Sequence, residues 1–236
     1  MSESITAIIP VREGSRRLRN KNLAPFGGQP LLVHKIRQLR RVAEINQIVV
    51  SSDSDRMLKL AAQEGVETHY RSPEFADDVV GRSWSETIVH IASRVTGDNL
   101  VWTHCTAPLI DEHTYRRAIA AYETALSGGY DSLLSVTRIH EYLWDENGPT
   151  NYSPGVGHPP SQQLPKLFRA TMGLFMAPRS DMISWRYLHG PHPFQMLVSK
   201  REAADIDDGL DLLSARAWLD AAPNQSAVNP FDASVA

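Results

Sequence analysis

The sequence predicts an α/β protein in which helices cover both faces of a mostly parallel sheet. Short apolar runs alternate with segments of helical periodicity along the chain, which is typical of parallel strands joined by crossover helices. The length of 236 residues is about what one α/β domain with an insertion requires. Hydrophobic residues make up 42% of the chain and charged residues 22%, which excludes a mainly disordered protein.

The elements follow in order from these patterns. Residues Ile5–Pro10 form an apolar run typical of a buried strand, and Leu32, Ile36 and Leu39 then recur at helical spacing. The same alternation continues as far as Leu219. The later strand-like segments are Gln47–Ser52, Glu67–Tyr70, Asn99–Thr103, Asp131–Val136, Leu167–Pro178 and Phe194–Ser199, and the later helices span about Ser54–Glu64, Ile88–Val95, Tyr115–Leu126, Ser180–Leu188 and Gly209–Leu219.

The alternation is interrupted between Thr137 and Pro165. This segment is rich in Trp, Gly, Pro, Asn and His, which favour an extended insertion over another helix. We interpret it as a lid or an oligomer contact. The predicted organisation is one domain over residues 1–220, with an insertion at about 137–167 and a loosely ordered tail at 221–236.

Charge and cysteine content exclude several classes of function. Lys and Arg total 24 against 27 Asp and Glu, a net charge of −3, so the electrostatic attraction that dominates nucleic-acid binding is missing. The apolar runs are far shorter than the roughly 20 residues that a membrane-spanning helix needs, and the first residues do not resemble a signal peptide. The single cysteine, Cys105, excludes an intrachain disulfide and a CxxC site. We therefore expect a cytoplasmic protein that binds neither nucleic acid nor membranes.

A basic loop follows the first strand, at the edge where open α/β sheets bind ligands. Glycine lets a backbone approach a polyphosphate, and cations offset its charge. The loop therefore indicates a phosphorylated ligand, the alternative being a solvated charged loop. It has neither the GxxxxGK[ST] nor the GxGxxG pattern, so Walker-type ATPases and ordinary dinucleotide dehydrogenases fit poorly. The residues concerned are Gly14 and Ser15, with the cations Arg12, Arg16, Arg17, Arg19 and Lys21.

Two later segments contribute further candidates. Asp205 and Asp207 are two residues apart in an extended stretch, so both side chains point the same way and could hold one Mg²⁺. The adjacent Asp208 is better interpreted as the N-cap of the last helix. His104 and Cys105 follow a buried strand. His104 is a candidate ligand contact there, whereas Cys105 is interpreted as a packed small hydrophobe rather than a nucleophile.

Seven segments, taken in order, resemble the acylneuraminate (CMP-sialic acid) cytidylyltransferase family. They are AIIPVREGSRRLRNKNLAPFGGQPLL, VVSSDSD, RSPEFADD, SWSETI, THCTAPLI, PSQQLPKLFR and DIDDGLDL. The resemblance implies a Rossmann-like three-layer nucleotidyltransferase fold whose extended insertion exchanges between the subunits of a homodimer. It also implies transfer of CMP from CTP to the anomeric oxygen of a keto-sugar acid, with release of pyrophosphate and a requirement for Mg²⁺.

The resemblance assigns roles to residues of the nucleotide half. It implies phosphate and nucleotide contacts for Arg12, Ser15, Lys21 and Asn22, cytosine recognition for Arg71 and Ser83, and metal ligation for Asp205 and Asp207. We take Arg12, Lys21 and Asp207 as the catalytic group, because cations that neutralise the departing pyrophosphate and a carboxylate that holds the metal act on the charge of the transferred group.

The sugar half departs from the family. His104 stands where the family has a glutamine and Ser161 where it has an arginine, so the expected clamp for the substrate carboxylate is missing. Either Arg169, Lys166 or Arg138 holds that carboxylate, or the substrate differs from N-acetylneuraminate. We favour another nonulosonic or ulosonic acid. The candidate sugar-binding residues are His104, Gln162, Gln163 and Arg169.

Two alternatives stay open. One is a nucleotidyltransferase of similar fold that acts on a sugar phosphate or a phosphonate. The other is a catalytically silent nucleotide-binding protein, against which the presence of Asp205 and Asp207 beside Arg12 and Lys21 argues.

Overall fold

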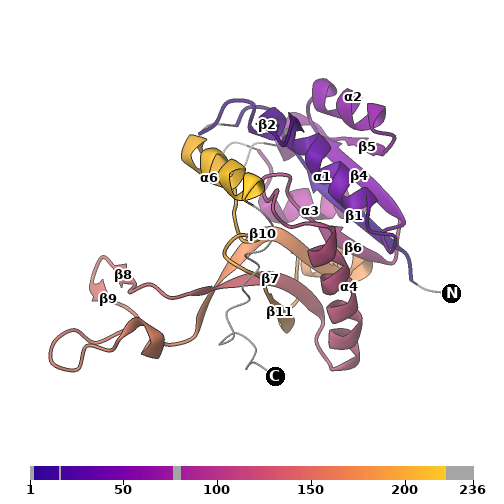
Figure 1. Cartoon of the computed structure of the whole chain (residues 1–236). Coiled ribbons are helices and arrows are strands. Elements are labelled where there is room, and N and C mark those ends of the chain that lie inside the picture. Colours follow the sequence, from indigo (N-terminus) through magenta and orange to yellow (C-terminus); the bar gives the residue numbers. More distant parts are fainter. Residues whose placement is uncertain (1–2, 16, 77–80, 222–236) are drawn as a thin grey trace.

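A seven-stranded sheet forms the centre of the computed structural model, which describes residues 3–15, 17–76 and 81–221. The strand order is β11-β7-β10-β6-β1-β4-β5 (Figure 1). Neighbouring strands are parallel except where β10 pairs antiparallel with β6 and β7. The predicted mostly parallel α/β fold is confirmed. The strands are β1 Ile5–Pro10, β4 Gln47–Ser52, β5 Glu67–Tyr70, β6 Asn99–Trp102, β7 Ser132–Ile139, β10 Leu167–Pro178 and β11 Pro193–Leu197.

Helices cover both faces of this sheet. Successive side chains of the central strand β1 point to opposite faces, and because both sets are mostly apolar, both faces must be covered. Ile9 of β1 packs in a core cluster with α1, α2, α4 and α6, whereas the adjacent Ile8 packs in a second cluster with α3 and α5. The result is a three-layer arrangement. The helices are α1 Leu31–Arg40, α2 Asp55–Gln63, α3 Trp84–Ala92, α4 Glu112–Ser127, α5 Arg179–Trp185 and α6 Gly209–Asp220.

Several short elements lie outside the sheet and its covering helices. Two small hairpins are formed by β2 Pro25–Phe26 with β3 Gln29–Pro30, and by β8 Trp144–Asp145 with β9 Gly148–Pro149. Three single 3₁₀ turns are η1 Lys21–Leu23, η2 Pro73–Phe75 and η3 Ser161–Gln163. Apart from residue 221, the predicted tail at 221–236 lies outside the described residues.

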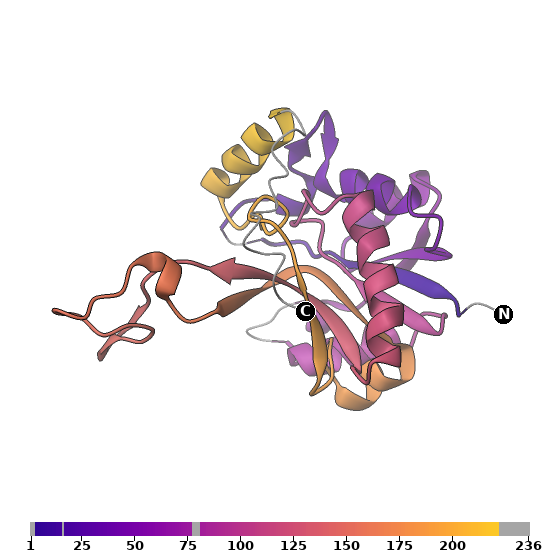
Figure 2. The same cartoon turned by 60° about the horizontal axis from the view of Figure 1, so that its bottom comes forward.

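The predicted insertion projects from the body of the molecule (Figure 2). It begins later than its composition indicated, because β7 continues to Ile139, which pairs with Leu167 at the start of β10. The irregular segment is therefore residues 140–166, which we call the arm. The arm contains the β8–β9 hairpin and η3.

Strand β10 is interrupted where it crosses the middle of the sheet. Its register with β7 shifts between Ala170 and Phe175. Gly173 lies in this bulge, and a Cβ there would approach the Ile110 side chain to 2.1 Å. The bulge brings β10 against the loop after β6, and only glycine fits at the contact.

The part of the chain that the structure describes contains no helix with both the length and the apolar character needed to cross a lipid bilayer.

Candidate active site

A cavity of about 640 Å³ opens where the central strands end. The chain runs from β1 to β4 and β5 on one side and then returns to β6 on the other, so β1 and β6 flank the point where the strand order reverses. Open α/β sheets bind ligands at such a point. The cavity is lined by Pro10, Arg12, Ser15, Arg17, Leu18, Lys21, Asn22, Arg71, Phe75, Ala76, Trp84, His104, Cys105, Thr106, Met172 and Asp207.

The basic loop after β1 forms one wall of this cavity. Arg12 donates from Nη1 to the carbonyl oxygen of Ala76 (3.0 Å), and its own carbonyl oxygen accepts from Asn22 Nδ2 (3.0 Å). Lys21 begins the turn η1 and reaches Asp207 Oδ1 at 3.1 Å. The structure thus brings the predicted residues Arg12, Ser15, Lys21 and Asn22 to one surface. Arg16 lies outside the described residues.

Arg71 supplies a further cation beside the basic loop. It follows β5, its side chain is buried, and its Nη2 donates to the carbonyl oxygen of Val11 (2.9 Å). Ser83 is placed differently: it caps α3, where its hydroxyl accepts from the amide of Glu86 (3.2 Å), and it does not line the cavity. Its predicted contact with the nucleotide stays a prediction.

His104 enters the cavity with a defined protonation state. Its Nε2 accepts a hydrogen bond from Trp102 Nε1 at 3.3 Å. Because an indole nitrogen only donates, the neutral ring must carry its proton on Nδ1. Burial, reinforced by the positive charges of Lys21 and Arg71, lowers the pKa of His104 to about 4. No described residue hydrogen-bonds to Nδ1, so a neutral donor is left for a ligand.

Cys105 is packed, as expected. Its thiol is buried and donates to Asn22 Oδ1 at 3.2 Å. Burial is the main cause that raises the pKa of this thiol to about 12, so the reactive thiolate is strongly disfavoured.

The two aspartates before α6 have different surroundings. Asp207 is 38% exposed, lines the cavity and pairs through Oδ1 with Arg17 (2.9 Å) and Lys21 (3.1 Å). Asp205 is more buried, and this burial raises the pKa of its carboxyl. Its Oδ1 is buried without a hydrogen-bond partner among the described residues. Asp208 caps α6 through the amides of Leu210 and Asp211, which confirms its predicted role.

A divalent cation fits this pair. A buried carboxylate oxygen without a partner loses the hydrogen bonds of water, and a hard cation is the ligand that carboxylate oxygens prefer. The described residues contain no cluster of three or more His, Cys, Asp or Glu, so any remaining ligands would have to come from substrate or water.

The other predicted sugar-binding residues lie away from the cavity. Gln162 and Gln163 belong to η3 in the arm. Arg169 lies on β10, donates to the carbonyl oxygen of Ala203 (3.1 Å) and lines a second cavity of about 700 Å³ with Arg138. Within one chain the structure therefore brings together His104 and the predicted nucleotide residues other than Ser83, but not the two glutamines or Arg169.

Comparison with known proteins decides the family. A family model described as cytidylyltransferase matches residues 6–151. The chain belongs to the cytidylyltransferase family. This confirms the resemblance noted in the sequence and makes the protein a CTP-dependent nucleotidyltransferase.

Relatives of this cytidylyltransferase extend the match along the chain. Pseudaminic acid cytidylyltransferase from Campylobacter jejuni is 23% identical over 221 residues, which cover 89% of this chain and 93% of the relative. N-acylneuraminate cytidylyltransferase A from Danio rerio is 26% identical over 219 residues, again 89% of this chain. The match spans 49% of the zebrafish protein, about half its length.

Solved structures share the fold. CMP:2-keto-3-deoxy-manno-octonic acid synthetase in complex with CTP superposes with a TM-score of 0.67 at 14% identity, covering 92% of this chain and 98% of that one. A 4-diphosphocytidyl-2C-methyl-D-erythritol synthase from Anaerococcus prevotii gives a TM-score of 0.66 at 12% identity, with the same coverage.

Several cavity residues of this cytidylyltransferase were not predicted from sequence. Phe75 and Trp84 line the cavity and flank residues 76–83 in the sequence. Phe75 is stacked on His90, with 3.9 Å between the ring centroids. Met172 reaches the cavity from the β10 bulge, a feature that no sequence pattern indicated. Thr106 was visible as a polar residue after a strand, which is the signal that already identified His104.

Proposed function

We propose that this protein transfers CMP from CTP to the anomeric hydroxyl of a nonulosonic or ulosonic keto-sugar acid and releases pyrophosphate. The observation that carries the proposal is the joint placement of Arg12, Lys21 and Asp207 around one cavity at the switch point of the sheet. The relatives named for pseudaminic acid and N-acylneuraminate support an acceptor of this class.

The cations serve the nucleotide in this proposal. Arg12 and Lys21 offset the charge that develops on the departing pyrophosphate, which is the main demand of phosphoryl-type transfer. Ser15 and Asn22 line the same wall and provide hydrogen bonds to phosphate or ribose. Arg71, close to Phe75, is assigned to the cytosine. A planar guanidinium suits recognition of a base edge.

We assign Mg²⁺ to Asp205 and Asp207. The buried Oδ1 of Asp205, which lacks a hydrogen-bond partner among the described residues, supports a cation at this position. When bound, Mg²⁺ would neutralise phosphate charge and lower the pKa of the acceptor hydroxyl. In its absence Lys21 and Arg17 offset the charge of Asp207.

His104 is assigned to the acceptor as a donor and not as a general base. Its Nε2 is engaged by Trp102, and its pKa of about 4 leaves the ring a weak base. The remaining Nδ1–H can donate to a carboxylate, carbonyl or hydroxyl oxygen of the sugar acid. This replaces the glutamine expected at that position.

The arm is assigned to a homodimer. Gln162 and Gln163 belong to η3 in the projecting arm (Figure 2) and do not line the cavity of their own subunit, so we propose that they complete the acceptor site of a partner. Arg169 lies on β10, where its charge acts on Asp205 of its own chain, and its contact with the sugar acid stays a prediction. We also expect the enzyme to work in the cytoplasm, where CTP is available and the single reduced thiol of Cys105 is stable.

The test is pyrophosphate release from CTP and Mg²⁺ with a panel of acids: N-acetylneuraminate, legionaminate, pseudaminate and 3-deoxy-manno-octulosonate. ATP, GTP and UTP replace CTP as controls, and a sugar phosphate and a phosphonate serve as control acceptors. CTP-dependent release with one keto-sugar acid supports the proposal. Release only with a phosphorylated acceptor, or CTP binding without release for any acceptor, overturns it.

A further inference from the structure

Lys35 is a charged residue at the centre of the core. It lies in the middle of α1, and its side chain is 0% exposed. Each of the three ammonium protons has an acceptor: the carbonyl oxygens of Ala107 (2.9 Å) and Ile110 (3.0 Å), and Tyr115 Oη (2.9 Å). Burying a cation costs stability even when it is fully hydrogen-bonded, and a hydrophobic side chain would pack there more cheaply.

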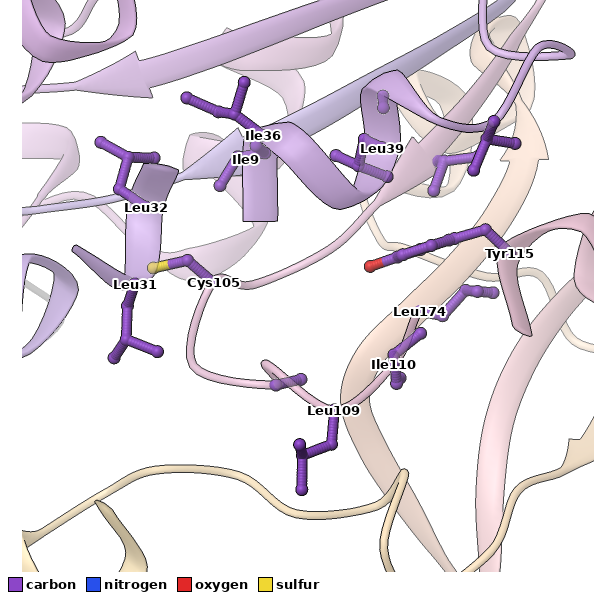
Figure 3. Close-up of a cluster of buried hydrophobic side chains, with 14 of the residues drawn as sticks. Ile9, Leu31, Leu32, Ile36, Leu39, Cys105, Leu109, Ile110, Tyr115 and Leu174 are labelled. Carbon is purple, nitrogen blue, oxygen red and sulfur yellow. The ribbon is translucent and has the colours of Figure 1, made fainter. Parts of the chain in front are cut away.

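The two carbonyl acceptors of Lys35 belong to the loop between β6 and α4, which we call the 103–110 loop, and Tyr115 follows it in α4. Two other residues of α1 hold the same loop: Gln38 Nε2 donates to the carbonyl oxygen of Pro108 (2.8 Å), and His34 Nε2 lies 3.1 Å from it. Figure 3 shows the apolar part of this contact, where Leu31 at the start of α1 lies beside Cys105 of the loop. One face of α1 therefore fixes the loop through its backbone.

A chain of hydroxyl groups extends this contact to β10. Thr103 donates its only hydroxyl proton to the carbonyl oxygen of Gly173 in the β10 bulge (2.6 Å). Thr103 Oγ1 therefore accepts from Tyr115 Oη (2.7 Å), which in turn accepts from Lys35. The carbonyl group of Gly173 thus sets the direction of the hydrogen bonds that run from α1 to β10.

The 103–110 loop carries the acceptor side of the cavity. His104 and Thr106 line it directly. The carbonyl oxygen of Thr106 accepts from the amide of Ile206 (2.8 Å), the residue between the two aspartates. The side chain of Thr106 also hydrogen-bonds to Asp205, which lowers the pKa of that carboxyl against the larger effect of burial. The position of the acidic pair therefore depends on the loop.

We propose that Lys35 is a positioning residue that holds the 103–110 loop, and through Thr106 the Asp205–Asp207 pair, in place for metal binding and turnover. The inference rests on the proposed function for its kinetic part only. Removing the ammonium leaves two loop carbonyl groups and one hydroxyl without their partner in the core, and a displacement near 1 Å at a catalytic group can cost on the order of 100-fold in rate.

The test compares Lys35→Met with Arg40→Met, which changes an exposed cation of the same helix. For Lys35→Met we expect kcat to fall about 10-fold or more and the Mg²⁺ concentration for half-maximal rate to rise about 5-fold. The KM for CTP should stay within about twofold, because Arg12 and Arg71 lie outside the loop. Arg40→Met should leave all three values unchanged. A merely structural role would lower the active fraction without changing the Mg²⁺ midpoint.

Direct Mn²⁺ binding, measured by electron paramagnetic resonance without CTP or acceptor, provides a readout that needs no turnover. Weaker Mn²⁺ binding in Lys35→Met supports the proposal, and unchanged binding in a folded variant overturns it. If Lys35→Met does not fold, Tyr115→Phe decides by the same measurement, since it removes only the hydroxyl between Lys35 and Thr103. If none of the sugar acids supports pyrophosphate release by the unmodified enzyme, the proposed function fails. The Mn²⁺ affinities still decide the role of Lys35.

Discussion

At the scale of single residues, Asp205 and Asp207 have different surroundings. Asp205 is buried, its pKa is raised by that burial, and its Oδ1 has no partner among the described residues. Asp207 is half-exposed and paired with Arg17 and Lys21. The raised pKa of Asp205, next to the cavity-lining Asp207, is typical of a functional site. The pair is therefore suited to bind one cation, with Asp207 on the side of the cavity.

Replacing Asp207 should separate activity from stability. We expect Asp207→Ala to lower turnover by roughly 100-fold or more, because a metal site loses several kcal/mol of charge stabilisation with one ligand. Its ion pairs are partly exposed and contribute about 0–1 kcal/mol, so the unfolding temperature should change little.

Pyrophosphate release and thermal unfolding measure the two effects. Asp208→Ala is the matched control: it removes the cap of α6, which should cost about 1 kcal/mol of stability while turnover is retained. Near-normal turnover in Asp207→Ala would remove this residue from the catalytic group.

Lys35 should make stability depend on pH in the alkaline range. Burial lowers its pKa from 10.5 to about 7, against weaker opposing effects of Cys105 and Asp111. Between these values the unfolded chain binds a proton that the folded chain does not, so the free energy of unfolding rises with pH, by at most about 1.4 kcal/mol per unit. Below about pH 7 both states are protonated and the effect ends.

Denaturant unfolding of the unmodified protein and of Lys35→Met at pH 7, 8 and 9 isolates this contribution, because His34, Tyr115 and the other titrating groups are common to both. We expect the unfolding free energy of the unmodified protein to rise with pH relative to that of Lys35→Met. A difference that stays constant over this range would show that Lys35 keeps an ordinary pKa in the folded protein.

At the scale of elements, the sequence predicted the strands and helices well because each has a simple apolar pattern. The run Ile5–Pro10 is buried on both faces, and helix α1 shows its periodicity through Leu32, Ile36 and Leu39. Lys35 was missed, although its spacing of four from Leu31 and Leu39 places it on the same apolar stripe. A cation is usually expected in solvent, and the carbonyl groups that hold it come from a distant loop.

The candidate site likewise contains residues that the sequence predicts and residues that it does not. Arg12, Lys21 and Asp207 could be predicted because each follows a strand or precedes a helix in a charged cluster. Met172 could not, because its position depends on the bulge in β10, where Gly173 packs closely against Ile110. Side chains brought to a site by tertiary contacts leave no local signal in the sequence.

The N-terminus of α3 provides a test of whether Ser83 acts as a helix cap or as a nucleotide contact. Ser83 and Glu86 form a reciprocal capping box. Ser83→Ala should therefore cost about 0.5–2 kcal/mol in unfolding free energy, and we expect the KM for CTP to stay within about twofold. Ser85→Ala, two residues further into the helix, is the control and should change neither quantity. A raised KM with unchanged stability would instead support the nucleotide contact predicted for Ser83.

At the scale of the whole molecule, the arm is the feature that a single chain does not explain. It has a small aromatic cluster of its own: Tyr142 lies 4.9 Å from Tyr152 and 4.8 Å from His158 between ring centroids. Trp144 donates from Nε1 to Tyr152 Oη at 2.6 Å, yet remains 65% exposed. Large apolar side chains gathered on a projecting segment mark an interaction surface.

We expect this surface to hold the proposed homodimer together, so that Trp144→Asp shifts the protein from dimer to monomer in sedimentation velocity. A buried carboxylate without a partner would cost several kcal/mol at each of two symmetric contacts, enough to dissociate most dimers at micromolar concentration. Turnover should fall with dissociation, because Gln162 and Gln163 would no longer reach the partner's cavity. Glu146→Ala, in the same hairpin, should leave the dimer intact. A monomeric unmodified enzyme with full turnover would contradict both the dimer and the assignment of these two glutamines to the acceptor.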